Sequence, residues 1–340
     1  MKKTAPTSKR EWRDGGRSKP AGRPAAKKNL SAGPKSKPAR QAAPQEAAPV
    51  PKTRVAKAKK LAVRNPNRKI MERARDLKEQ RSNLDSIEPM RLQKALAASG
   101  VGSRREMEAW IDQGWVTVNG KTARLGDKVS PEDQVVVKGN VIKLKWPDRL
   151  PRIILYYKQE GEIVSRDDPQ GRVSVFDRLP QAASSRWVAI GRLDINTSGL
   201  LILTTSGELV NRFAHPSFEV EREYAVRVLG ELSVEQMRML TGEGVMLDDG
   251  LAVLERIQEQ GGEGANKWYK VVIKEGRNRE VRRIFESQGL TVSRLVRVGF
   301  GPIGLPNRLK RGQFYELNPA EVAGVLRWAD MRLPGDKRRR

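Results

Sequence analysis

The sequence GRLDINTSGLLILTTSG, residues 191–207, places a short polar loop directly before a run of consecutive apolar residues. The run is bounded by Gly199 and Gly207 and has the length of a strand, so it predicts a buried β-strand. Asp194 lies in the polar loop, two residues after Arg192. Taken alone, an aspartate in D-x-N-T-S-G favours an Asx-turn or a capping role over a nucleophilic one.

Segments on both sides of this strand predict an α+β domain over residues 151–330. Short helices are expected at 232–240 and 278–288, and the second is amphipathic. The order of segments lacks β-α-β regularity, and no glycine-rich phosphate loop follows a strand. We therefore expect a mixed, mainly antiparallel sheet with helices packed on it. The other expected strands are RIILYYK at 152–158, WVAIGRL at 187–193, EREYAVRVLG at 221–230 and WYKVVI at 268–273.

Residues 90–150 have a different pattern, two short helices followed by a small hairpin sheet. The first helix is expected in MRLQKALAASG, 90–100, and ends at its glycine. Ser103 is expected to cap the second helix, SRREMEAWIDQG, with Glu106 at the capping-box position. The Asn119–Gly120 pair predicts a hairpin turn, and QVVVK at 134–138 predicts a further strand. This segment is thus predicted to be a small domain of its own.

The positive charge of the 340-residue chain is concentrated near its N-terminus. Lys and Arg number 66 against 40 Asp and Glu, a formal net charge of +26. Residues 1–89 hold 25 basic and 8 acidic residues, a net +17. Their few apolar side chains cannot offset the entropy of ordering, so we expect a basic arm over 1–89, disordered through residue 66 and with a short helix at 67–84. A solubilising tail without a specific role is the alternative. Residues 331–340 form a basic C-terminal tail.

Composition also excludes several classes of chemistry. The chain has no cysteine and one histidine, which removes disulfides, thiolate metal sites and multi-histidine metal centres. That histidine, His215, precedes Pro216 and is better explained as a turn residue than as a general base. No apolar run approaches the roughly 20 residues of a membrane span. The excess of positive charge then favours a soluble cytoplasmic protein whose partner is nucleic acid.

Three motifs of the chain resemble those of one enzyme family. G-R-L-D-x-x-T-x-G-L-L-x-L-T, residues 191–204, is similar to the signature of the RNA pseudouridine synthases. EREYAVRV and KEGRNREVRRIFESQGLTVSRLVRVGFGPI resemble two further motifs of that family. Residues 90–150 contain SRRE, V-x-V-N-G and D-x-V-V-V in order and resemble the S4-type RNA-binding domain carried by one branch of the family. In detail the chain is most similar to the members of that branch that modify large-subunit ribosomal RNA.

The resemblance implies catalytic roles for three residues. Asp194 takes the position of the catalytic aspartate, Tyr224 that of a tyrosine packed against the target uracil, and Arg282 that of an arginine paired with the carboxylate. Leu295 takes the position of an apolar residue in the third motif. From the pattern alone, Tyr224 also fits a core position of a strand, and Arg282 fits a salt bridge on a helix surface.

The resemblance also implies a set of RNA-facing residues, for which ordinary solvated surface charge is the alternative. The set is Lys94, Arg104 and Arg105 in the S4-type domain, and Arg192, Arg222, Asn278, Arg279 and Arg283 in the second domain.

The implied reaction can be carried out by these residue types alone. Conversion of uridine to pseudouridine breaks the N1–C1′ bond, turns the base and rejoins it through C5, without redox change or consumption of water. We therefore expect no cofactor and no metal. A carboxylate is ionised at neutral pH and can act as the catalytic group on any of three routes. It can attack C1′, add to C6 or remove a proton on a glycal route. Because a stacked base is out of reach, we expect it to be flipped out onto an aromatic side chain.

The leading expectation is thus a monomeric enzyme that isomerises a specific uridine in ribosomal RNA, the 23S rRNA of the large subunit or its precursor, with no membrane partner. A non-catalytic RNA-binding or ribosome-assembly protein is the alternative from another class. A membrane-surface protein is less favoured, because the basic arm lacks the apolar face of an amphipathic anchor.

Overall fold

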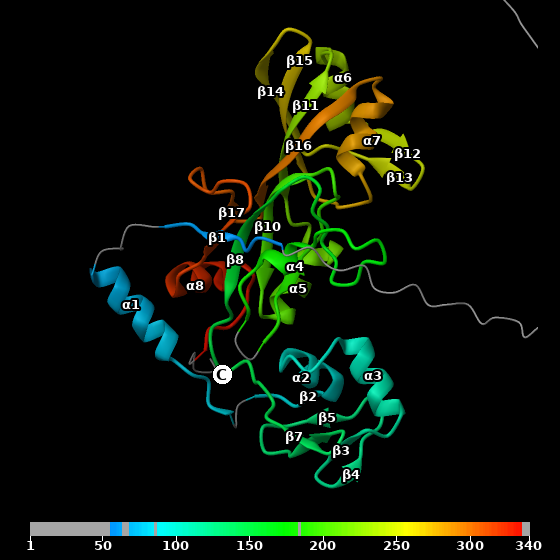
Figure 1. Cartoon of the computed structure of the whole chain (residues 1–340). Coiled ribbons are helices and arrows are strands. Elements are labelled where there is room, and N and C mark those ends of the chain that lie inside the picture. The colour runs from blue at the N-terminus through cyan, green and yellow to red at the C-terminus, as the bar shows by residue number, and fades with distance from the viewer. Residues whose placement is uncertain (1–54, 63–67, 85–86, 183–184, 335–340) are drawn as a thin grey trace, which may run out of the picture. The chain divides into compact units, whose positions relative to one another are not determined.

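The computed structural model describes residues 55–62, 68–84, 87–182 and 185–334 (Figure 1). Most of the predicted disordered arm, residues 1–54, and the end of the C-terminal tail, residues 335–340, lie outside the described residues. Within the described ranges, no helix is both long and apolar enough to cross a membrane.

The larger part of the described chain is built on one ten-stranded sheet. Only the pairings β1–β18 and β10–β16 are parallel, so the predicted mixed, mainly antiparallel sheet is confirmed. In addition, β9 (Val188–Ile190) pairs with β10, and β17 (Ile303–Gly304) pairs with β16. The main strand order is β1 (Lys59–Lys60), β18 (Gln313–Glu316), β8 (Ile153–Lys158), β10 (Ser198–Thr204), β16 (Thr291–Phe300), β11 (Arg222–Leu229), β15 (Asn266–Ile273) and β14 (Arg256–Glu263).

Strand β10 is the centre of this sheet, as its apolar run predicts. All seven of its residues are buried, and their side chains alternate between two core clusters on opposite faces. Leu201 and Leu203 belong to one cluster, whereas Leu200 and Ile202 belong to the other. A strand covered on both faces has no need of polar alternation, which explains the continuous apolar sequence.

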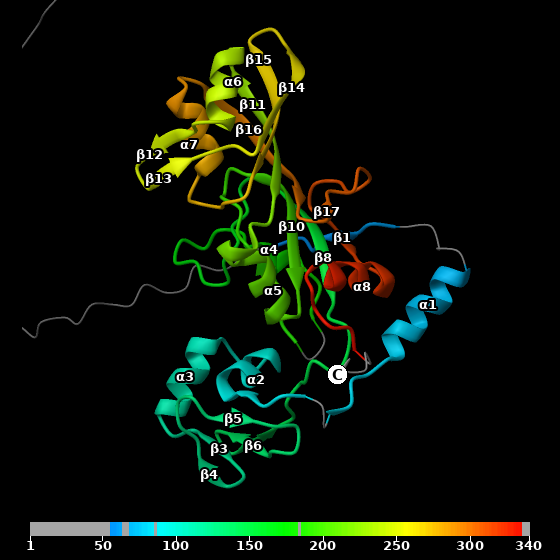
Figure 2. The same ribbon diagram turned by 180° about the vertical axis from the view of Figure 1, so that it is seen from behind.

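Helices cover the two faces of the sheet. The cluster that contains Leu201 also takes side chains of α4 (Val175–Arg178), α6 (Val234–Thr241) and α7 (Glu280–Ser287). The opposite cluster takes side chains of α5 (Gly207–Ala214) and α8 (Pro319–Trp328). In Figures 1 and 2, α6, α7 and the hairpin of β12 (Val245–Leu247) and β13 (Gly250–Ala252) gather around β11, β14, β15 and β16.

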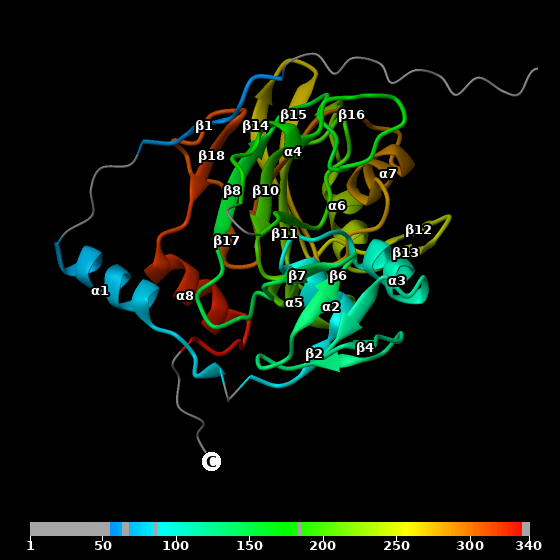
Figure 3. The same ribbon diagram turned by 60° about the horizontal axis from the view of Figure 1, so that its bottom comes forward.

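Residues 90–142, within the predicted domain of residues 90–150, contain the expected two helices and small sheet (Figure 3), and they have an apolar core cluster of their own. Ser103 and Glu106 make the expected capping box, at 3.1 and 3.2 Å. Asn119 and Gly120 both have positive φ, 51° and 79°, as a two-residue hairpin turn requires. The elements are β2 (Met90–Arg91), α2 (Leu92–Ala98), α3 (Arg104–Asp112), β3 (Val116–Val118), β4 (Lys121–Thr122), β5 (Lys128–Val129), β6 (Val135–Val137) and β7 (Asn140–Ile142).

The predicted disorder through residue 66 is wrong for residues 55–62. Lys59 and Lys60 pair in parallel with β18, and the Leu61 N–H donates to the Phe314 carbonyl at 2.8 Å. The pairing satisfies backbone groups at the edge of the sheet, which composition does not reveal. The predicted helix over 67–84 is present but shorter, as α1 (Arg68–Glu79).

Candidate active site

Asp194 lies in the loop of residues 191–197, between β9 and β10. The Thr197 N–H donates to the Asp194 carbonyl at 3.1 Å, so the aspartate opens a tight turn, as its local sequence predicts. Its side chain is half-buried, and no donor among the described residues makes a hydrogen bond or ion pair with its carboxylate. The carboxylate is therefore free to meet a substrate.

A buried lysine holds this loop by its backbone. Lys158, at the end of β8, is 0% exposed, and its Nζ donates to the carbonyls of Asp194 at 2.9 Å and Thr197 at 2.8 Å. Burial lowers the pKa of Lys158 to about 8, although the charges of Glu162 and Asp194 oppose that shift. Sequence reasoning assigned this lysine only to a strand. The one sequence feature that could have indicated its role is the position of a lysine at the end of an apolar strand.

Glu162 fixes the neighbouring turn. It is 2% exposed, it accepts hydrogen bonds from the Tyr156 hydroxyl at 2.9 and 3.0 Å, and it pairs with Arg178 at 2.6 Å. The Gly161 N–H in the same turn donates to the Ile195 carbonyl at 2.8 Å. The loop of Asp194 is thus braced from β8 through both side-chain and backbone contacts.

Arg282 braces the loop from the opposite side. It comes from α7 and is 8% exposed, and its two Nη atoms donate to the carbonyls of Asn196 at 2.8 Å and Val292 at 2.9 Å. The predicted direct pair with Asp194 is absent, since no ion pair within 4.0 Å joins the two in the described chain. The two Nη atoms of its guanidinium donate to two backbone carbonyls instead. A helix-surface salt bridge, the other interpretation, does not fit its burial either.

The charge of Asp194 still reaches Arg282. Burial lowers the pKa of Arg282, the nearby Arg279 lowers it further, and the Asp194 carboxylate raises it. The two groups therefore interact through space although they share no hydrogen bond.

Tyr224 is on β11 and belongs to the core cluster of α7, with 8% of its surface exposed. Its cross-strand partner on β16 is Arg297, a residue that sequence reasoning missed. Burial lowers the pKa of Arg297, and the neighbouring Tyr224 opposes that shift. Leu295, two residues earlier on β16, is also buried, at 4% exposure.

Arg297 connects Tyr224 to the strand that follows the Asp194 loop. Its side chain is 2% exposed, its Nε donates to the Leu200 carbonyl at 2.8 Å, and its guanidinium lies 4.8 Å from the Phe300 ring centre. Gly199 pairs with Arg297 so closely that an added Cβ would lie 2.3 Å from the Arg297 carbonyl oxygen. The glycine of the signature motif is thus required by the approach of β10 to β16.

The structure divides the expected RNA-facing residues into two groups. Lys94, Arg104, Arg105 and Arg192 are exposed, and none of them makes an ion pair with a described residue. Asn278 is exposed as well.

The remaining three arginines are engaged within the protein. Arg283 makes a bidentate pair with Asp249 at 2.9 and 2.7 Å, and Arg279 pairs with Glu286 at 3.2 Å. Arg222 donates to the carbonyls of Val220, Lys274 and Glu275. Arg279 remains exposed beside its pair with Glu286, whereas Arg222 and Arg283 are half-buried, and the RNA-facing role of all three stays a prediction.

His215 is a turn residue, as predicted. It ends α5, is exposed, and its Nδ1 accepts from the Ser217 N–H at 3.3 Å. Nothing in the described site contacts it.

Comparison with known proteins bears on both domains. The family described as RNA pseudouridylate synthase matches residues 152–287, and the family described as S4 domain matches residues 90–135. The ribosomal large subunit pseudouridine synthase B of Pseudomonas aeruginosa is 53% identical over 234 residues, 68% of this chain and 60% of that protein. Its namesakes in Salmonella typhimurium and Escherichia coli K12 are each 52% identical over 235 residues, 68% of this chain and 80% of theirs.

Solved structures include one titled as a pseudouridylate synthase, which is 23% identical and has a TM-score of 0.49 while covering 69% of this chain and 99% of its own.

The two family matches define the class of protein: an RNA pseudouridine synthase that carries an S4 domain, and therefore an isomerase. This class sets aside the alternative of a non-catalytic RNA-binding protein. Within it, the chain belongs to the family of ribosomal large subunit pseudouridine synthase B.

Proposed function

We propose that this protein converts a uridine of large-subunit ribosomal RNA to pseudouridine, and that the Asp194 carboxylate is its catalytic group. The observation that carries the proposal is an unpaired, half-buried carboxylate on a loop whose backbone is bound by two buried cationic side chains. The names of the similar bacterial proteins support the large-subunit target.

The two cations have a positioning role in this proposal. Lys158 and Arg282 bind carbonyl oxygens of the loop, which leaves both carboxylate oxygens of Asp194 for the substrate. A preorganised loop needs no rearrangement when the nucleotide arrives, so a fixed carboxylate can act at once as nucleophile or base.

Tyr224 is the proposed platform for the uracil. Its ring is mostly covered by the core and it lies opposite Arg297 on the neighbouring strand, so only a small part of the residue is exposed to meet a flipped base. The exposed basic residues of the S4 domain and Arg192 are the proposed contacts for RNA phosphates.

Removal of the carboxylate tests the catalytic assignment. Asp194→Asn keeps the size of the side chain and the backbone contacts of the loop, but it removes the charge that must attack or deprotonate the nucleoside. We expect the single-turnover rate to fall by several orders of magnitude, with RNA affinity changed less than about tenfold. The measurement is conversion of uridine under single-turnover conditions, beside a binding titration and a melting curve.

Asp167→Asn, at an exposed position of another loop, is the matched control and should convert uridine at the wild-type rate. A folded Asp194→Asn protein with near wild-type turnover would refute the assignment. The RNA target is tested separately, by mapping pseudouridines in ribosomal RNA from cells with and without the protein; an unchanged large-subunit map would contradict it.

A further inference from the structure

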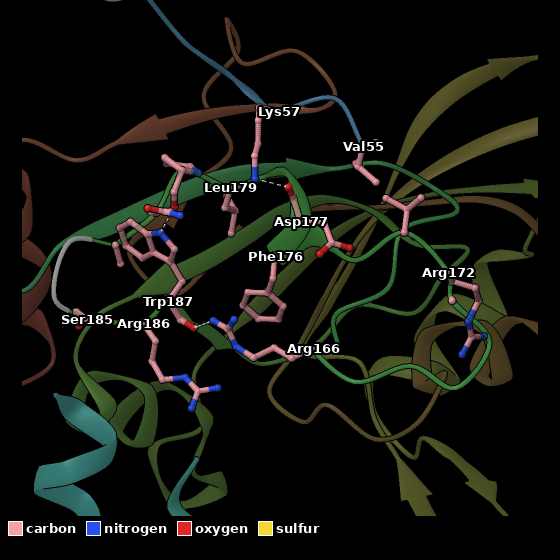
Figure 4. Close-up of a pocket in the computed structure, with 15 residues that line it drawn as sticks. Val55, Lys57, Arg166, Arg172, Phe176, Asp177, Leu179, Ser185, Arg186 and Trp187 are labelled. Carbon is pink, nitrogen blue, oxygen red and sulfur yellow. Dashed lines mark hydrogen bonds between the residues drawn. The ribbon is translucent and has the colours of Figure 1, made fainter. Parts of the chain in front are cut away.

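A cavity of about 600 Å³ lies apart from the proposed catalytic residues (Figure 4). Asp194, Tyr224, Arg282 and Arg297 do not line it. Its walls come from the loop before α4, from α4 itself, from the segment leading into β9 and from the N-terminal segment before β1. The lining side chains with polar or aromatic chemistry include Lys57, Arg166, Arg172, Phe176, Arg186 and Trp187.

One arginine of the cavity is fixed in place without a counter-charge. Arg166 donates from Nη2 to the Trp187 carbonyl at 2.7 Å, and its guanidinium lies 4.1 Å from the Phe176 ring centre. In the described chain it makes no ion pair with a carboxylate. A guanidinium that is held against an aromatic ring and donates to one carbonyl has further N–H groups left for another acceptor.

A second arginine lies beside it. Arg186 directly precedes Trp187 and also lines the cavity, and in Figure 4 its side chain extends downward from the level of Arg166. The charge of Arg186 lowers the pKa of Arg166, in addition to the larger lowering by burial, so the two guanidinium groups repel each other. No described carboxylate pairs with Arg186 either.

A third arginine of the cavity has a counter-charge, which sets Arg166 and Arg186 apart from it. Arg172 makes a bidentate ion pair with Asp168, at 2.7 and 3.1 Å, and the Lys57 Nζ donates to the Asp177 carbonyl at 2.8 Å. Two like charges that line one cavity and act on each other are unfavourable alone, and an anion bound between them offsets the repulsion.

We propose that Arg166 and Arg186 bind a backbone phosphate of the RNA, at a subsite separate from the reacting uridine. The proposal rests on the proposed RNA substrate. RNA is favoured over a small anion by the course of the chain: the cavity wall includes Val55 and Lys57, and the 54 residues before them carry 15 Lys and Arg against 3 Asp and Glu. The segment that joins the cavity wall at Val55 is therefore strongly basic in sequence, which favours a polyanion as the bound partner.

The subsite is tested by binding, with the full chain and a short RNA hairpin that has a uridine-rich loop. Arg186→Gln removes one guanidinium that has no partner in the described protein, so the fold should be retained. We expect its Kd for the hairpin to rise about three- to tenfold. When Arg166→Gln is combined with it, the slope of log K against log salt should fall by about 0.7, which corresponds to one fewer bound phosphate.

Arg172→Gln is the matched control, because it removes a guanidinium of the same cavity that Asp168 already neutralises; its Kd and slope should equal those of the wild type. If a lower melting temperature shows that Arg166→Gln destabilises the protein, the binding data for Arg186→Gln alone test the proposal. Equal Kd and salt slope for Arg186→Gln and wild type would overturn the proposal, as would an equal loss of affinity in Arg172→Gln. The experiment measures RNA binding and does not depend on turnover. This proposal would therefore stand even if the assignment of Asp194 as the catalytic group failed.

Discussion

Charged side chains around Asp194 bind the backbone of its loop and leave its carboxylate alone. Lys158 and Arg282 between them donate to all four carbonyls of residues 194–197. Each buried cation needs acceptors to offset its desolvation, and loop carbonyls supply them without neutralising the aspartate. The arrangement keeps positive charge close to the carboxylate and keeps its oxygens unbonded.

Lys158 gives the stability of the protein a pH dependence. Its pKa is about 8 when folded, against 10.5 as the ordinary value, so between these limits the unfolded chain binds more protons than the native one. The free energy of unfolding that this group contributes must then rise with pH, by at most about 1.4 kcal/mol per unit. We expect the difference in unfolding free energy between wild type and Lys158→Met to grow from pH 8 to pH 10, by chemical denaturation. A constant difference would contradict a buried, titrating lysine.

Replacement of Arg297 is expected to maintain or raise stability and to lower activity. It is a buried cation with no ion pair in the described chain, and one of its Nη atoms lacks a hydrogen-bond partner. Replacement by a residue of similar length without charge removes a desolvation cost, while Tyr224 loses its charged cross-strand neighbour. Arg297→Met should therefore melt at the wild-type temperature or higher, yet convert uridine at least about tenfold more slowly in single turnover.

Arg297→Lys, which keeps a donor, should recover part of that rate. Lower melting temperature with an unchanged rate would show that Arg297 serves the fold alone.

At the scale of helices and strands, the sequence predicts what is encoded locally. The apolar run of β10, the capping box at Ser103 and the Asn119–Gly120 turn are short-range patterns, and all three are confirmed. The motif resemblance likewise leads to Asp194. Adjacency in the sheet is not local, so the contact of Arg297 with Tyr224 could not be read from spacing.

Two further errors of the sequence-based prediction have the same cause, a contact that is not local in the sequence. Arg282 was assigned to the carboxylate because a motif names a residue but not which oxygen it binds, and here it is the Asn196 carbonyl. The strand at Lys59–Lys60 was missed because its pairing uses backbone groups, while its side chains look like those of a disordered arm.

The capping box makes a prediction at this scale. Ser103→Ala leaves the Glu106 N–H without its side-chain acceptor and should destabilise α3 by about 1 kcal/mol. Amide hydrogen exchange across Arg104–Asp112 should then be about fivefold faster, because local opening follows local stability. Glu106→Gln preserves the box and should exchange at the wild-type rate. Equal exchange in the Ser103→Ala variant would mean that packing alone holds the helix.

For the whole molecule, the uneven distribution of charge is the feature with the widest consequence. Residues 1–54 carry a net +12, nearly half of the +26 of the chain, outside both recognised domains. Such a segment adds affinity for any RNA through release of counterions, a contribution that weakens steeply with salt.

Deletion of residues 1–54 is therefore expected to separate affinity from chemistry. The cut falls before β1, so the pairing of Lys59 and Lys60 with β18 is retained. RNA affinity at low salt should fall, and the slope of log K against log salt should become shallower by roughly 0.7 for each phosphate that the arm no longer neutralises. At saturating RNA the single-turnover rate should stay within about twofold of wild type, because the bound carboxylate geometry is unchanged. A large fall in the saturated rate would place the arm in the active site, and an unchanged salt slope would show that its charge does not meet the RNA.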